Sequence, residues 1–286
     1  MSIDIITTTF RNTEKLKLCL KTVVERTKYV DYKWYVWVNE PNDEMKQIIH
    51  DAMYIDGILF NDHIEPIFND DNTGSFSSNN NSAVKEGKGD YILFLNDDIE
   101  PLNENWLVSM QNILDTDSKV GAVGALLLYP NKLVQHCGVM FDPRTNGLPY
   151  HIMYKQQPTT FVQANRYYQA VTAACMLVRR VDFEALGGFD EKYFYGYEDV
   201  DLCLKLKHNL AKSVVYCANA QLIHHEGISG SFKQHPKLQD NIKVFKEAWQ
   251  GKIFNDHQFY IQNPNFMTYK IKVVEPKEED KEVDIE

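Results

Sequence analysis

The chain has 286 residues, with 30 Lys or Arg, 40 Asp or Glu and a formal net charge of −10. Apolar residues make up 44% of it, a proportion typical of folded globular proteins that excludes a disordered or fibrous chain. The negative balance argues against non-specific nucleic-acid binding, which needs a basic surface, and no apolar run reaches the ~18 residues of a membrane-spanning helix.

In the first half of the chain, predicted strands alternate with predicted helices. Short apolar and β-branched runs predict strands at residues 3–9, 34–38, 64–68 and 91–95. Apolar residues at helical spacing predict helices at residues 16–24, 45–53 and 77–85, with Asn12 and Thr13 as capping candidates for the first. Because such alternation joins strands through right-handed crossovers, we expect an α/β fold built on a parallel sheet.

The second half of the chain is less regular. Strands are predicted at residues 120–129, 134–141, 170–179, 213–217 and 221–223, and helices at residues 106–114, 200–207 and 240–249. Residues 142–168 look irregular and aromatic. Residues 275–286 hold seven acids and two lysines, which predicts a disordered tail.

The first chemical feature is the run Asn96-Asp97-Asp98, directly after the apolar strand predicted at residues 91–95. In open α/β sheets ligands bind beyond the carboxyl ends of the strands. Carboxylate oxygens suit Mg²⁺ and Mn²⁺, which proteins often share with substrate phosphates. A metal–diphosphate site and an ordinary turn rich in Asn and Asp explain this run equally well.

The second feature is a cluster of acids, Glu198, Asp199 and Asp201, which follows a Gly- and aromatic-rich segment and opens a predicted helix. Acids at a helix amino terminus are favoured by the helix dipole. An ionised carboxylate at this place can also act as a general base. Three acids in four positions exceed what one helix end requires.

The third feature is the pair His224-His225, which follows the apolar run at residues 221–223. A single histidine is more often structural than functional, but imidazole is a common ligand for first-row metals. A pair at a strand end, in a chain with an acid run, favours a metal ligand.

Four sequence motifs occur in this order along the chain: NTGSFSSNNN, GDYILFLNDD, GGFDEKYFYGYEDVDLCLKL and HHEGIS. Together they resemble glycosyltransferase family 2, over most of residues 3–230, and especially its branch of rhamnosyltransferases and polysaccharide-assembly enzymes. The resemblance implies a GT-A fold, with a Rossmann-like, mostly parallel central sheet flanked by helices. It also implies a catalytic domain at residues 1–230, followed by a helical extension at residues 231–274 and the tail at residues 275–286.

The resemblance implies a divalent cation, Mn²⁺ or Mg²⁺, that bridges the diphosphate of a nucleotide sugar. Asp98 would bind this cation together with His224, which lies three and five places before Gly227 and Ser229 as in the family; His225 is the alternative ligand. A cation held there neutralises the charge that develops on the departing nucleoside diphosphate.

The resemblance also implies an inverting transfer. Asp199, with Glu198 beside it, would be the catalytic base that deprotonates the acceptor hydroxyl, and this hydroxyl attacks the anomeric carbon opposite the leaving nucleotide. A positioned base typically contributes about 10²–10⁴ in rate.

Donor-binding positions follow from the same match, and the donor would carry UDP, dTDP or GDP. Asn39 stands where the family often has an Asp that reads the base. The implied donor-binding residues are Thr8, Phe10, Asn39, Gly74, Asn80, Asn96 and Asp97.

The implied acceptor is a hydroxyl of a glycan or lipid-linked glycan. Several residues of the irregular middle could stack on an acceptor sugar, although packing is the more frequent role of each: His136, Tyr150, His151, Tyr154, Tyr167 and Tyr168.

Two other functions stay open at this point. A non-catalytic binding module on the same fold would have an incomplete site, whereas here the acid run, the Glu198-Asp199 pair and the histidine are all present. A sugar-phosphate nucleotidyltransferase needs a Gly-rich phosphate loop near the amino terminus, but residues 7–15 contain no Gly.

The cysteines and the amino-terminal segment indicate the cellular compartment. The five cysteines are scattered without a CxxC pair, which predicts buried, reduced thiols. With no recognisable secretory signal, we expect a cytoplasmic protein; association with the cytoplasmic face of a membrane and oligomerisation stay open.

Overall fold

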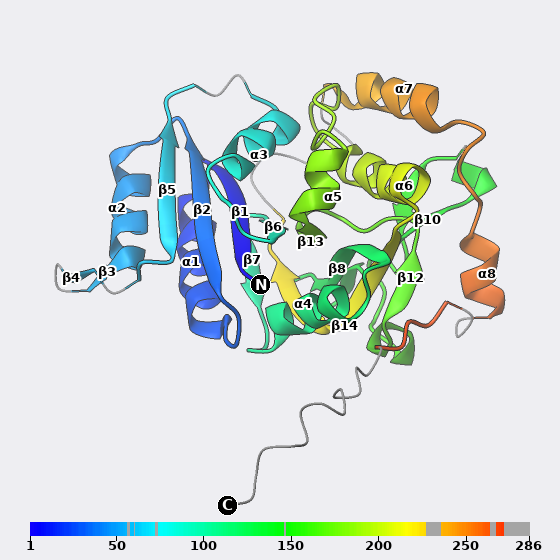
Figure 1. The fold of residues 1–286 in the computed structure, drawn as a ribbon, viewed down its shortest axis with the longest axis horizontal. Helices are drawn as coiled ribbons and strands as arrows, with labels where there is room; N and C mark the ends of the chain where they lie inside the picture. The colour runs from blue at the N-terminus through cyan, green and yellow to red at the C-terminus, as the bar shows by residue number, and fades with distance from the viewer. Residues whose placement is uncertain are drawn as a thin grey trace, which may run out of the picture.

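The computed structural model describes residues 1–55, 58–59, 61–71, 74–145, 147–226, 236–263 and 267–271. A central sheet with helices on both faces dominates these residues (Figure 1). The predicted tail at residues 275–286 and the Gly227–Ser229 part of the histidine motif lie outside the described residues.

The central sheet has the strand order β12-β14-β8-β13-β6-β1-β2-β5, with β7 paired to β14 and β9 paired to β8. Its strands are β1 (Ile3–Phe10), β2 (Tyr32–Asn39), β5 (Ile64–Asn69), β6 (Tyr91–Leu95), β7 (Ile99–Pro101), β8 (Val120–Leu128), β9 (Val134–His136), β12 (Arg166–Tyr168), β13 (Cys175–Arg179) and β14 (Ser213–His224). Two small sheets pair β10 (Val139–Phe141) with β11 (Pro149–His151) and β3 (Tyr54–Ile55) with β4 (Ile58–Leu59).

The sheet is mixed but mostly parallel. Strands β6, β1, β2 and β5 are parallel neighbours, and β8 is parallel to β14. Between these two groups lies β13, antiparallel to both β6 and β8. All six parallel-running strands therefore end at the same edge, as the predicted fold requires.

Alternating side chains of each strand build a core on each face of the sheet. Leu93 and Leu95 of β6 join a core with the helices on one face, while Ile92 and Phe94 join the core on the other, because successive strand residues point to opposite faces. The first face carries α1 (Thr13–Arg26), α2 (Asp43–Met53) and α4 (Trp106–Thr116). The second carries α3 (Phe76–Val84), α5 (Arg180–Ala185), α6 (Glu198–Leu210) and α7 (Leu238–Trp249).

Three strand predictions were wrong in detail. The strand predicted at residues 134–141 is split into β9 and β10, because Gly138 has a φ of +126° and turns the chain. The strand predicted at residues 170–179 begins only at Cys175. The strands predicted at residues 213–217 and 221–223 are one strand, β14, with an irregular register between Cys217 and Gln221.

Residues 142–168, predicted as irregular, also hold some regular structure. They contain β11, β12 and the two short 3₁₀ turns Pro143–Thr145 and Thr160–Gln163.

Helix α7 packs on the body of the protein through buried polar contacts. Trp249 donates its indole N–H to Oδ1 of Asp201 on α6 at 2.7 Å. Asn241, also buried, donates to the carbonyl of Tyr195 at 2.5 Å and accepts from the N–H of Phe194 at 3.2 Å. The third acid of the 198–201 cluster therefore anchors α7.

The short helix α8 (His257–Gln262) lies against β12 and the residues after it. Just before the helix, Asp256 accepts hydrogen bonds from the N–H of Phe141 at 2.9 Å and from the amide of Gln169 at 2.9 Å. Residues 236–263 thus form part of the folded body.

All five cysteines are buried and unpaired, as predicted. Among the described residues, no helix combines the length and the apolar character that crossing a membrane requires.

Glycine is required for different reasons at the two positions that follow α5. Gly187 and Gly188 both have a φ of +80°, a left-handed conformation that glycine adopts without strain. A Cβ on Gly187 would meet no atom within 4 Å, whereas a Cβ on Gly188 would lie 2.6 Å from Oδ1 of Asn81. That amide cannot yield easily, because it accepts from the N–H of Phe189 and donates to its carbonyl, both at 2.9 Å.

We expect Gly187→Ala to destabilise the protein by about 1–2 kcal/mol, which is the left-handed backbone cost alone. Gly188→Ala adds the clash with Asn81 and should lose clearly more stability. Urea unfolding monitored by circular dichroism measures both free energies of unfolding. Equal losses in the two variants would contradict the role given to Asn81.

Candidate active site

The site lies where the parallel strands end, and its two acid groups come from different halves of the chain. The acid run Asn96-Asp97-Asp98 follows β6, and the N–H of Asn96 donates to the carbonyl of Ala174 at 3.0 Å. The N–H of Ala173 in turn donates to Oδ2 of Asp199 at 3.0 Å. Residues 173–174 therefore join the acid run to the acid cluster at the start of α6.

Asp97 is held by two side chains of the first strand–helix connection. Thr9 donates its hydroxyl to Oδ2 of Asp97 at 2.6 Å, and Asn12 donates its amide to Oδ1 at 3.0 Å. Burial, with the neighbouring charge of Asp98, raises the pKa of Asp97 to about 7. Asn12, a predicted helix cap, makes no side-chain capping bond and serves Asp97 instead.

Asp98 is buried and faces a histidine. Its Oδ1 lies 3.1 Å from Nε2 of His224, and the other described residues give this oxygen no hydrogen-bond donor. Burial acts to raise the pKa of Asp98, but the contact with His224 and the charge of Lys15 outweigh it and lower that pKa below its usual value.

The orientation of the His224 ring is fixed from its far side. Oε1 of the buried Gln135 lies 2.5 Å from Nδ1 of His224, so Nδ1 carries the proton that it donates. Nε2 then presents a lone pair toward Asp98 in the neutral ring. Two acceptor atoms at 3.1 Å need a proton or a cation between them.

The pair Asp98 and His224 can hold a divalent cation by the chemistry of its atoms, one carboxylate and one imidazole. In the described part of the chain no cluster of three or more His, Cys, Asp or Glu side chains forms a metal site. A cation here would therefore complete its shell with water or ligand oxygens. The backbone N–H of His225 donates to the carbonyl of Asp98 at 3.0 Å, but its imidazole lies 3.3 Å from Glu100, so only the imidazole of His224 faces the Asp98 carboxylate.

Glu198 and Asp199 are sequence neighbours with different surroundings. Asp199 is half-buried, and its two oxygens accept the N–H groups of Ala173 at 3.0 Å and Val200 at 2.8 Å. Glu198 is buried; burial and the charge of Asp199 raise its pKa to about 8. At neutral pH Glu198 is thus mostly protonated.

The predicted donor-binding residues of the first two strands end side by side. Phe10 of β1 pairs with Asn39 of β2, which pairs with Asn69 of β5. Thr8 is half-buried and Phe10 is 40% exposed. Asn39 is buried, and its Oδ1 accepts from the indole of Trp37 at 3.1 Å and from the amide of Asn69 at 3.0 Å.

Gly74 and Asn80 are explained by local packing around α3. A Cβ on Gly74 would lie 2.1 Å from Oδ1 of Asn79. The buried Asn80 donates to the carbonyl of Phe76, one turn earlier in its own helix, at 2.8 Å. The structure shows no bond between these two residues and the acid run.

Sequence reasoning missed the roles of three residues that shape the site. Thr9 and Asn12 hold Asp97, and Gln135 holds His224. The carbonyl of Gln135 also lies 3.0 Å from Nδ1 of His151. Only contacts between distant segments reveal these roles, because a lone Thr, Asn or Gln carries no motif.

Comparisons with known proteins identify the family and the fold. The profile of the family described as "Glycosyl transferase family 2" matches residues 4–187. The chain is 36% identical over 165 residues to "O-antigen biosynthesis protein RfbC" of Myxococcus xanthus, covering 56% of this chain and 13% of that protein. It is 33% identical over 144 residues to "Rhamnosyltransferase WbbL" of Escherichia coli K12, covering 46% of this chain and 53% of that protein.

The chain thus spans about half of one of these relatives and a small part of the other. Among solved structures, it superposes on GalNAc-T7 with UDP, GalNAc and Mn²⁺ at a TM-score of 0.67 and 14% identity. The match covers 93% of this chain and 51% of the other. The two proteins therefore share a fold, the GT-A fold that the motifs predict.

The buried Glu198 makes stability depend on pH. Its pKa is raised from an ordinary 4.5 to about 8, so between these values the folded state holds a proton that the unfolded state has lost. Stability therefore falls as pH rises through this window. Glu198→Gln cannot ionise, and we expect its Tm to rise relative to the wild type as pH increases from 5 to 8.

Thermal unfolding at pH 5, 6, 7 and 8 measures this difference. Glu104→Gln, at an exposed acid, is the matched control and should follow the wild type. A constant offset between Glu198→Gln and the wild type at every pH would contradict the raised pKa.

Proposed function

The chain belongs to glycosyltransferase family 2, and on this premise we propose that it is a metal-dependent inverting glycosyltransferase. It moves a sugar from a nucleotide-sugar donor to a hydroxyl of a glycan or lipid-linked glycan. The observation that carries this proposal is that residues 173–174 bond both Asp199 and Asn96, and that the run starting at Asn96 ends in Asp98, which faces His224. The relatives named for O-antigen biosynthesis and rhamnosyl transfer support the glycan acceptor.

Asp98 and His224 would hold the cation, Mn²⁺ or Mg²⁺, and the related fold crystallised with UDP and Mn²⁺ supports this choice. When bound, the cation neutralises charge on the diphosphate of the leaving nucleotide. The chain's own contribution is orientation: Gln135 holds Nδ1 of His224, so that Nε2 faces Oδ1 of Asp98 at 3.1 Å and the amide nitrogen of Asn96 at 3.3 Å. Such outer contacts fix the tautomer and direction of a ligand histidine.

Asp199 is the base. Backbone N–H groups hold both of its oxygens while leaving each a further lone pair. The acceptor hydroxyl gives its proton to Asp199 as its oxygen bonds to the anomeric carbon. The bond from that carbon to the diphosphate breaks on the opposite face, and its electron pair stays on the phosphate oxygen. The configuration is therefore inverted.

Glu198 acts beside the base as a neutral acid. Burial and the charge of Asp199 raise the pKa of Glu198, which favours its neutral form beside the base. In this proposal Asp199 accepts the proton, and the buried Glu198 does not.

The nucleoside lies across the ends of β1, β2 and β6. Thr8 and Phe10 flank it, Asn39 lies toward its base, and Asn96 and Asp97 lie toward the ribose. UDP, dTDP and GDP donors all remain compatible with this set.

Removal of the base is the direct test. We expect Asp199→Asn to lower the rate of sugar transfer by roughly 10²–10⁴, while nucleotide binding with Mn²⁺ stays within about twofold. Nucleotide release measures turnover, and calorimetry with UDP, dTDP and GDP measures binding. Asp240→Asn, at an exposed acid of α7, should keep full activity; full activity in Asp199→Asn would refute the assignment.

The two adjacent histidines provide a matched test of the metal site. We expect His224→Asn to weaken Mn²⁺ binding at least tenfold and His225→Asn to leave it nearly unchanged, because only His224 faces Asp98. Gln135→Leu should weaken it by about 10–100-fold through lost orientation of the ring. Titration of free Mn²⁺ by electron paramagnetic resonance with saturating UDP measures these affinities; the reverse order of the histidines would contradict the site.

A further inference from the structure

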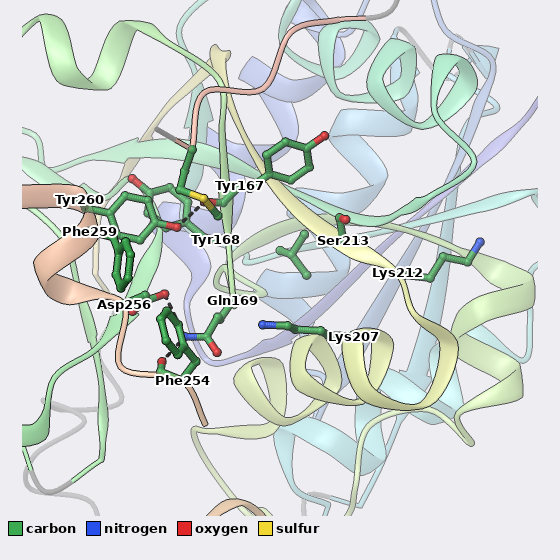
Figure 2. Close-up of a pocket in the computed structure, with 12 residues that line it drawn as sticks. Tyr167, Tyr168, Gln169, Lys207, Lys212, Ser213, Phe254, Asp256, Phe259 and Tyr260 are labelled. Atoms are coloured by element: carbon green, nitrogen blue, oxygen red, sulfur yellow. Dashed lines mark hydrogen bonds between the residues drawn. The ribbon is translucent and has the colours of Figure 1, made fainter. Parts of the chain in front are cut away.

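A second cavity, of about 540 Å³, lies away from the acid site, between β12, the carboxyl end of α6 and α8 (Figure 2). Tyr168 is the last residue of β12, Gln169 follows it directly, and Lys207 comes from α6. Phe254 and Phe259 come from the segment around α8. The proposed transfer does not use this pocket.

The pocket contains two buried polar groups that lack partners. Gln169, 5% exposed, donates its amide nitrogen to the carbonyl of Phe254 at 2.6 Å and to Asp256 at 2.9 Å. The part of the chain that the structure describes offers no hydrogen-bond partner to Oε1 of Gln169 or to the hydroxyl of Tyr168. Figure 2 shows this oxygen of Gln169 turned away from Phe254 and Asp256. Buried polar groups without partners are rare and require an explanation.

The same pocket exposes aromatic surface. Phe254 is 54% exposed and Phe259 44% exposed, and their ring centroids lie 5.2 Å apart. Lys207 stands exposed at the rim, whereas the ammonium group of Lys212 is occupied by Asp182 at 3.3 Å and the carbonyl of Ser118 at 2.8 Å. The pocket thus combines apolar rings with the neutral groups of Tyr168 and Gln169, and its lining also includes Lys207, Lys212 and Asp256.

This combination matches a saccharide ring. A pyranose presents an apolar C–H face to aromatic rings, and its hydroxyls both donate, as Gln169 Oε1 requires, and accept, as the Tyr168 hydroxyl requires. A lipid chain would leave both groups unpaired, and a phosphate would meet the carboxylate of Asp256. We propose that this pocket binds a sugar unit of a glycan, apart from the site of transfer.

The pocket is connected to the transfer site by short stretches of chain. Asp199 and Lys207 lie eight residues apart on α6, about 12 Å along the helix axis. Gln169 lies four residues before Ala173, which bonds Asp199. An oligosaccharide can span this separation. If the chain transfers sugar as proposed, one acceptor glycan can therefore contact both sites. Binding of a second sugar unit in this pocket raises the effective concentration of the acceptor hydroxyl at the transfer site.

The test is binding of simple sugars to the full chain. Saturation-transfer NMR would use the methyl glycosides of glucose, galactose, mannose and rhamnose together with N-acetylglucosamine, in the presence of UDP and Mn²⁺ to occupy the donor site. We expect at least one sugar to bind, and to bind equally well to Asp199→Asn. Phe254→Ala and Phe259→Ala, both at exposed rings, should weaken that binding at least tenfold with an unchanged Tm.

Tyr29→Ala is the matched control, because Tyr29 is 73% exposed and remote in the fold from α8. No binding by any of the sugars, or binding that survives both Phe variants, would overturn the proposal. Loss of binding only in Asp199→Asn would also overturn it, because the sugar would then occupy the transfer site. Sugar binding with no transfer from any nucleotide sugar would instead refute the proposed function and leave the pocket assignment standing.

Discussion

The hydrogen bond from the N–H of Ala173 to the carboxylate of Asp199 is the contact on which the site depends. The chain just before β13 is thereby fixed to the start of α6, while the next residue, Ala174, accepts the N–H of Asn96. Because β13 runs antiparallel between two groups of parallel strands, its first residues reach the edge at which those strands end. The acid run and the base are brought together by this reversal.

The two acids of each neighbouring pair in the site have different surroundings. Burial raises the pKa of Asp97, whereas the contact with His224 lowers that of Asp98. Glu198 is buried with a raised pKa, and Asp199 is half-buried with both oxygens held by backbone N–H groups. Neighbouring carboxyl groups with different environments serve different roles, and here one member of each pair can be neutral while the other carries charge.

Several motif residues serve the fold, although they stand among residues of the site. Asp201 binds Trp249 and so attaches α7 to α6. Asn81 joins α3 to the segment after Gly188 through both groups of its amide. Asn80 bonds to its own helix. A motif thus records packing constraints and chemistry together, and only the contacts of each side chain separate the two.

The sequence by itself determined the α/β class, the helices and longer strands of the first half, and the three places where acids and a histidine stand, since local periodicity and strand-end chemistry depend on near neighbours. It missed the short strands β3, β4 and β7. It misplaced the start of β13 and the break at Gly138, because distant backbone contacts and a left-handed turn set these boundaries. The choice of His224 over His225 was suggested by motif spacing, but the ring directions appear only in three dimensions. Gln135, Thr9 and the pocket beside α8 were decided by tertiary structure alone, because their partners lie dozens of residues away in the chain.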